Sequence, residues 1–302
     1  MGKDTIYEMV TDQIVAALEA GTVPWRKPWN PTTWPRNIEG HRYRGANLFL
    51  LAYSPYESPF WLTYKQATER GGSVRGEKTT MITFWKRLMV TDKDTGERAM
   101  IPMLRFYRVF NLEQTEGVKL PQAVADWSPA DTVPDPIAEA EAIVKGYPKP
   151  PSILVTASDQ AFYMPDLDQI TVPSLKQYDV ADEYYSTLFH EMGHSTGHPD
   201  RLARKYGKMF GSHDYGREEL VAEMTAAFLC AESGITMTMD NSAAYLASWI
   251  KTIKEDTRAV VTAAGAAQRA ADHILGRTFE DQKADADEAP ADNTEKKLEV
   301  VA

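Results

Sequence analysis

The middle of the chain contains the pattern H-E-x-x-H, from His190 to His194. Apolar residues recur at helical spacing before it, so we expect residues 182–196 to form a helix. Residues four apart share one face of a helix, so the imidazoles of His190 and His194 can reach one metal ion. Glu191 follows His190 directly, at the place where a general base for an attacking water is needed. The spacing therefore predicts a metal site of the zinc-peptidase type.

Such a site usually has a third protein ligand. His198 is the nearest candidate, but its spacing is two residues shorter than in the three-histidine pattern of known zinc peptidases. His213, in a predicted loop, is a second candidate. We favour Glu219, in a second predicted helix, as the ligand, and expect Glu223 on the same face to hold the free N–H of a ligand histidine. Glu218 is expected to face solvent. The alternative is that these histidines and acids are only solvated helix residues.

The net charge of −10 is unevenly distributed along the 302 residues. Residues 1–119 contain 17 Lys and Arg against 13 Asp and Glu, a balance of +4, whereas the remainder contains 16 against 30, a balance of −14. This asymmetry indicates an anionic partner for the first part. The chain has one cysteine, no run of eighteen apolar residues and no signal-peptide pattern, so we expect a cytoplasmic protein without a membrane span.

The expected fold class is α+β, in two domains. An N-terminal α+β domain is followed by a linker rich in Pro, Ala and Asp, a C-terminal domain that is mostly helical with a small sheet, and a disordered acidic tail, with boundaries at 1–116, 117–135, 136–278 and 279–302.

Finer patterns predict the principal elements of both domains. The first contains β-like segments at 79–90 and 100–110. The second contains a hairpin, 161–164 with 169–172, whose edge can hold an extended peptide by strand addition. Residues 241–275 read as one long helix with a possible break at Gly265.

With these residues laid out, the chain resembles the ArdC antirestriction protein family of conjugative plasmids from about Tyr7 to Ile274. The resemblance implies an N-terminal single-stranded-DNA-binding domain joined to a zincin-like metallopeptidase domain. It also implies a protein that shields incoming plasmid DNA from host restriction endonucleases, one of which is a possible partner or substrate. The most specific matching segments are Phe162–Asp166, Tyr185–His198, Arg217–Glu223 and Ala244–Ile250.

Single-strand binding needs a cationic groove and aromatic faces on which bases stack. Five of the seven tryptophans lie in residues 1–119, several beside Lys or Arg. Trp61 and Trp85 lie within apolar elements and are expected in the core. The predicted DNA contacts are Trp25, Arg42, Tyr43, Arg44, Lys65 and Lys86.

Two functions remain open from the sequence. In the first, the protein binds single-stranded DNA and carries a peptidase site, which holds Zn²⁺ or, with the same ligands, Mn²⁺ or another divalent metal. Glu191 is then the base, and His213 or Tyr215 stabilises the oxyanion. In the second, the protein coats DNA or occludes the endonuclease, and the metal site is structural or vestigial. A weaker third reading is a self-processing protease that cuts near residues 117–135.

Overall fold

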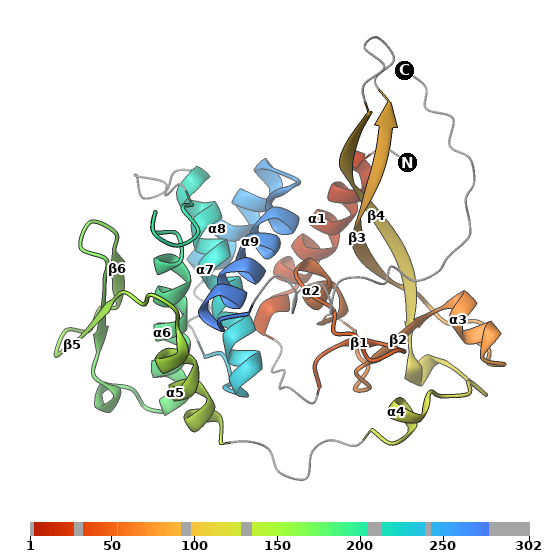
Figure 1. Ribbon diagram of the computed structural model, residues 1–302, viewed down its shortest axis with the longest axis horizontal. Coiled ribbons are helices and arrows are strands. Elements are labelled where there is room, and N and C mark those ends of the chain that lie inside the picture. Colours follow the sequence, from red (N-terminus) through yellow and green to blue (C-terminus); the bar gives the residue numbers. More distant parts are fainter. Residues whose placement is uncertain are drawn as a thin grey trace.

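The computed structural model describes residues 3–26, 33–52, 54–91, 98–127, 135–204, 213–238 and 243–277. The fold is α+β, as the sequence predicts (Figure 1). Within these ranges no helix combines the length and apolarity needed to cross a bilayer. The predicted tail lies outside them. The helices are α1 (Lys3–Glu19), α2 (Ala46–Ala52), α3 (Tyr64–Glu69), α4 (Gln122–Ala125), α5 (Pro136–Gly146), α6 (Ala181–Ser195), α7 (His213–Ser233), α8 (Ala243–Glu255) and α9 (Ala259–Ile274), with 3-10 turns η1 (Pro24–Arg26), η2 (Leu112–Gln114) and η3 (Leu175–Gln177).

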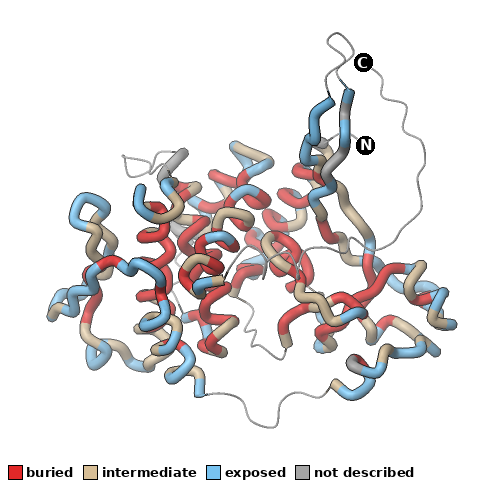
Figure 2. The backbone as a smooth tube through the Cα atoms, in the orientation of Figure 1, coloured by how far each residue is buried: buried red, intermediate tan, exposed pale blue. Residues whose placement is uncertain are grey.

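The N-terminal half is built on a sheet of order β1-β2-β4-β3. Its strands are β1 (Arg36–Asn37), β2 (Phe60–Thr63), β3 (Thr80–Thr91) and β4 (Arg98–Asn111). The first two pair in parallel, and the other pairs are antiparallel. The β3–β4 ribbon projects past α1 as an arm (Figure 1), and its outer part is exposed (Figure 2).

Trp85 corrects one expectation about this arm. It was expected in the core, as Trp61 is, but it is 52% exposed whereas Trp61 is 2% exposed. Further out on the same ribbon, the paired residues Met89 and Met100 are also exposed. Trp85 therefore lies where the ribbon leaves the body of the molecule, and its apolar neighbours along the strand do not signal burial.

The C-terminal half contains a small sheet of order β5-β7-β6, made of β5 (Ser152–Thr156), β6 (Phe162–Met164) and β7 (Gln169–Pro173). β5 pairs in parallel with β7, and β6 pairs with β7 as the predicted hairpin. Because β7 is the central strand, it cannot add a peptide at its edge. Of the two candidates for strand addition, only β6 lies at an edge of this sheet.

The prediction of one long helix over 241–275 is wrong. α8 and α9 are separate helices, and Gly265 lies inside α9. The chain breaks at Asp256, whose carbonyl accepts from the amide of Ala259 at 2.8 Å, while the next carbonyl, of Thr257, accepts from the Thr11 hydroxyl at 2.8 Å. Asp256 also pairs with Arg217 of α7. The contacts with Thr11 and Arg217 are tertiary, so helical periodicity does not reveal the break.

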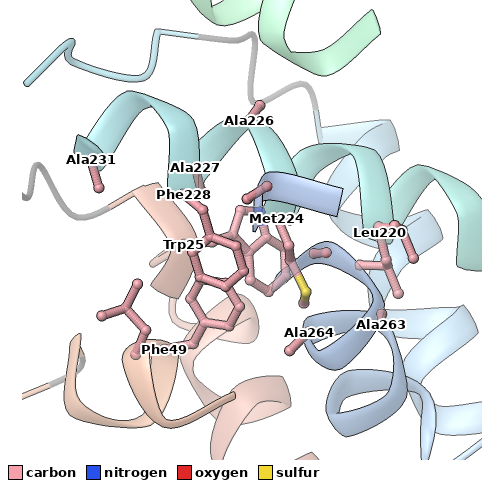
Figure 3. Packing of buried hydrophobic residues seen from close by; sticks show 14 of the residues in the cluster. Trp25, Phe49, Leu220, Met224, Ala226, Ala227, Phe228, Ala231, Ala263 and Ala264 are labelled. Carbon is pink, nitrogen blue, oxygen red and sulfur yellow. The ribbon is translucent and has the colours of Figure 1, made fainter. Parts of the chain in front are cut away.

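The two halves share one buried core. The Phe49 ring of α2 stacks on Phe228 of α7 with centroids 5.2 Å apart (Figure 3). Trp25 packs edge-on against Phe49 at 5.9 Å and against Trp249 of α8 at 5.4 Å. Burying each of these rings contributes about 1.5–3 kcal/mol. Apolar packing therefore fixes the N-terminal half on the C-terminal helices.

Part of the segment predicted as a linker is ordered. It contains α4, and Trp127 packs edge-on against Phe60 of β2 with ring centroids 5.5 Å apart. Packing of the N-terminal half thus extends to Trp127. The domain boundaries at 116 and 135 stay a prediction.

Candidate metal centre

The close approach of two helices forms the site. Gly193 lies where α6 crosses α7, and a β-carbon at this position would stand 3.1 Å from Cα of Ala222 and 3.2 Å from Cβ of Thr225. The glycine therefore permits this approach, although it costs about 1 kcal/mol of helix stability relative to alanine. His190 and His194 lie on the same face of α6, one turn apart, and meet the acids of the first turns of α7.

Three side chains converge at this crossing: His190, His194 and Glu219. The two imidazole Nε2 atoms are 3.1 Å apart. The Glu219 carboxylate lies 3.6 Å from Nε2 of His190 and 3.4 Å from Nε2 of His194. Ligand atoms about 2.0–2.2 Å from a tetrahedral zinc ion are roughly 3.3–3.6 Å apart; the two separations from Glu219 lie in this range, and the separation of the imidazoles is slightly shorter.

The electrostatic surroundings also fit a cation. Glu191, Glu218 and Glu223 are all buried near the two imidazoles. Burial alone would lower the pKa of both histidines, but the surrounding carboxylates outweigh it, and the pKa of each lies above its usual value. Burial likewise opposes ionisation of Glu219, yet the two imidazoles hold the pKa of its carboxyl below its usual range. This donor set, two imidazoles and a carboxylate, suits a divalent metal.

Glu218 corrects the expected roles of the α7 acids. It was expected to face solvent, but it is buried, with its carboxylate 3.5 Å from Nδ1 of His194. Arg204 donates to both carboxylate oxygens, at 2.7 and 3.1 Å, and to the Gly193 carbonyl at 2.8 Å. Glu218 therefore orients the His194 ring through its Nδ1 atom, and Arg204 stabilises both Glu218 and the C-terminal end of α6.

Glu223 does not accept the predicted hydrogen bond. Its Oε2 atom and Nδ1 of His190 are both buried without a hydrogen-bond partner among the described residues. Arg26 of η1 lies 3.8 Å from the Glu223 carboxylate. Burial raises the pKa of Glu223 above its usual range. Glu218, rather than Glu223, therefore contacts the outer nitrogen of a ligand histidine. The rotation of α7 about its axis directs the Glu218 side chain toward His194.

The remaining residues that the sequence suggested as base, third ligand or oxyanion stabiliser lie beside the three-residue cluster or outside it. Glu191 is 7% exposed and adds to the field that raises the pKa of both histidines. His198 is not part of the cluster, and its Nδ1 accepts from the amide of Asp200 at 3.2 Å. α7 begins at His213, where a loop was expected. The side chains of His213 and Tyr215 lie outside the described part of the structure.

Burial excludes two of the predicted DNA contacts as stacking surfaces. Trp25 is 1% exposed and Tyr43 is 5% exposed, and burial raises the pKa of the Tyr43 hydroxyl. Both rings belong to hydrophobic clusters. Sequence alone placed them beside cations, but it could not show that the C-terminal helices or the sheet cover them.

Two predicted arginine contacts connect the halves instead. Arg42 pairs with Glu232 of α7 at 3.1 Å, and its guanidinium lies 5.2 Å from the centre of the Trp34 ring. Arg44 pairs with Asp272 of α9. Both arginines are engaged with acids of the C-terminal half, so neither presents a free charge to a phosphate.

The two predicted lysine contacts remain at the surface. Lys65 lies 3.8 Å from Glu69 one helical turn along α3. Lys86 is exposed on β3. Their contact with DNA stays a prediction.

Replacing Glu218 with alanine should lower the affinity for a divalent metal by about 10–100-fold, the usual effect of removing a residue that orients a ligand histidine. Competition with a chelating dye measures this affinity. Glu255→Ala is a matched control, because that acid lies on the exposed side of α8. Equal affinities of the two variants would contradict the role of Glu218.

The comparisons with known proteins agree with this architecture. Residues 4–110 match the family described as the N-terminal domain of anti-restriction factor ArdC, and residues 139–266 match the family described as zincin-like metallopeptidase. The chain is 36% identical over 297 residues to DNA primase TraC of Escherichia coli. The match covers 90% of this chain but only 27% of the primase. It is 32% identical to the uncharacterized protein y4eC of Sinorhizobium fredii, over 92% of this chain and 94% of the relative.

Two crystal structures of the antirestriction ArdC protein from the R388 plasmid are similar along most of the chain. The metal-free structure matches with a TM-score of 0.73 and the Mn(II)-bound structure with a TM-score of 0.72, each at 36% sequence identity. The matches cover 89% of this chain and 96% and 97% of the crystallised chains. In sequence, in domain order and in fold, the chain belongs to the ArdC antirestriction family.

Proposed function

We propose that this protein protects incoming plasmid DNA from host restriction endonucleases, by binding single-stranded DNA and by hydrolysing a protein substrate at the α6–α7 site. The convergence of His190, His194 and Glu219 carries the peptidase part of the proposal. The Mn(II)-bound structure of the R388 relative supports the binding of a divalent metal. Zinc is the metal that this donor set favours first.

In the proposed site His190, His194 and Glu219 hold the metal. A divalent metal held there would supply Lewis-acid chemistry, polarising a peptide carbonyl and making water more acidic. Glu191 takes a proton onto its carboxylate from the attacking water and passes it to the leaving amine. Arg204 and Glu218 keep the His194 ring in its orientation. β6, at the edge of its sheet and in contact with α6, can pair with an extended substrate chain.

The DNA-binding part of the proposal is supported by the charge distribution and the family. Residues 1–119 carry a balance of +4 in a chain of −10, and they correspond to the N-terminal domain of ArdC. Because this half shares a core with the peptidase-like half, DNA and the metal site are held at a fixed spacing. A strand bound to the first half then brings an attacking endonuclease close to the second.

Protection in cells tests the proposal. Unmodified single-stranded plasmid DNA is delivered by conjugation into a restricting host and into an isogenic host without the endonuclease. Wild-type protein should raise recovery only in the restricting host. Glu191→Gln should lose this protection while its affinity for single-stranded DNA is unchanged.

Full protection by Glu191→Gln would contradict the proteolytic part. It would favour the alternative in which the protein coats DNA or occludes the endonuclease and the metal site has no turnover. Glu183→Gln, a substitution on the same helix two turns before the motif, is the matched control.

A further inference from the structure

A groove of about 610 Å³ opens in the N-terminal half. Its walls come from α1, the segment that follows α2, the turn before β3 and the inner end of the β3–β4 arm, which lies beside α1 (Figure 1). It shares no residue with the metal centre. Its volume lies within the range of sites that bind small organic groups, which is about 300–1,000 Å³.

The lining of this groove carries positive charge without negative charge. Lys78 and Arg108 line it, and no Asp or Glu does. Both cations are exposed, and neither forms an ion pair with an acid in the part of the chain that the structure describes. Arg42 and Arg44, in contrast, are paired with acids of α7 and α9. Within a protein of net charge −10, this is a place where an anion meets unneutralised cations.

Two aromatic residues line the same groove. Phe106 and Arg108 are two residues apart on β4, so they point to the same face of the ribbon, roughly 7 Å from each other along the strand. Tyr56 also lines the groove, half-buried, and its ring packs edge-on against Trp61 with centroids 6.1 Å apart. This contact restricts the orientation of the Tyr56 ring.

A neighbouring hollow lacks this combination. It has a volume of about 400 Å³ and shares Ser54, Pro55 and Tyr56 with the groove. Glu57 lines it, and no Lys or Arg does. The hollow is therefore lined without cations, whereas the groove is lined by both cations and aromatic rings. Only the second offers both a face for a base and charges for a phosphate.

We propose that the groove lined by Tyr56, Lys78, Phe106 and Arg108 binds a nucleotide unit of single-stranded DNA. A base stacks against an aromatic ring, and the flanking phosphates contact Lys78 and Arg108. Gln13, which is held at the wall by its hydrogen bond to the Leu50 carbonyl at 3.3 Å, lies where a base edge can be contacted. This inference rests on the proposed binding of single-stranded DNA and assigns that binding to one surface.

The test uses the full chain and a fluorescein-labelled oligonucleotide of mixed sequence, with binding followed by anisotropy at several salt concentrations. Lys78→Gln with Arg108→Gln should lower the affinity at least tenfold. It should also reduce the slope of log K against log salt by about 1.4, since each phosphate contact on a single strand contributes about 0.7. Arg75→Gln with Lys119→Gln removes the same charge from exposed positions outside the groove, and should change the affinity less than threefold.

A second pair of variants separates stacking from charge. Tyr56→Leu should lower the affinity between about fivefold and a hundredfold, whereas Tyr56→Phe, which keeps the ring, should bind as the wild type does. Circular dichroism and the melting temperature check that Tyr56→Leu is folded. Equal losses for Leu and Phe would exclude stacking at Tyr56 and overturn this part of the inference.

The outcomes distinguish this inference from the proposed function. If the wild-type protein has no affinity for the oligonucleotide, the proposed binding of single-stranded DNA is wrong. If the wild type binds and the Lys78/Arg108 variant binds as tightly as the Arg75/Lys119 control, the proposed function stands and the groove is not the site. Photo-cross-linking of an iodouracil-containing strand should then map away from Tyr56 and Phe106, whereas the inference requires cross-links at one of them.

Discussion

Replacing Glu191 with glutamine should reduce the rate of peptide hydrolysis on the order of 10²–10⁴-fold, the usual contribution of a positioned general base. Glutamine has nearly the same shape as glutamate but cannot take a proton from the attacking water. Glu191 is not in the group of three side chains that can hold the metal, so metal content should be unchanged. Hydrolysis of an unfolded protein substrate, measured with metal and with chelator, gives the rate.

The comparison with Glu183→Gln decides whether the effect belongs to this position. Glu183 lies in the first turn of the same helix, and its carboxylate accepts from the amide of Asp179 at 3.3 Å. That control should hydrolyse as the wild type does. If Glu191→Gln retains metal-dependent hydrolysis at the wild-type rate, Glu191 is not the base.

The features that sequence predicts well here are those set by local spacing. The helix around the motif, the hairpin of β6 and β7 and the long pair β3–β4 all follow from periodicity within a dozen residues. The facing of His190 and His194 follows from the same rule, since one helical turn separates them. Each of these depends on contacts close in sequence.

The predictions that failed depend on contacts between distant segments. Trp25 and Arg44 looked like a DNA-binding surface from their neighbours in the chain, but Trp249 covers one and Asp272 pairs with the other. Both partners come from helices more than 200 residues away. No local pattern encodes the fact that the two halves share a core.

Within the site, the sequence predicts which acids share a face of α7, but it does not predict how α7 is rotated about its own axis. Glu218, Glu219 and Glu223 all lie on α7, and spacing alone groups the last two on one face. The packing of α7 against α6 at Gly193 sets a rotation in which Glu218 meets Nδ1 and Glu219 meets Nε2 of His194. Two adjacent acids therefore contact the two nitrogens of one imidazole, which only the packed structure reveals.

Replacing His194 with alanine should abolish tight metal binding. Removing a residue that orients a ligand histidine lowers the affinity about 10–100-fold. The loss for His194→Ala should be larger, so the binding free energy should weaken by more than about 2.7 kcal/mol. Removal of the ring takes away one of three converging donors and also deprives the buried Glu218 carboxylate of its imidazole partner, leaving Arg204 as its neighbouring cation among the described residues. Zinc and Mn²⁺ are titrated separately, zinc against a chelating dye and Mn²⁺ by its paramagnetic resonance signal.

His198→Ala is the matched control, because it removes the same side chain four residues later. The His198 ring lies outside the cluster and contacts the amide of Asp200, so its loss should leave the affinity for either metal within about threefold. If His198→Ala weakens binding and His194→Ala does not, the ion is held by a different set of side chains. That result would mean that His190, His194 and Glu219 do not bind the ion together, and that the α6–α7 crossing is a network of ion pairs rather than a metal centre.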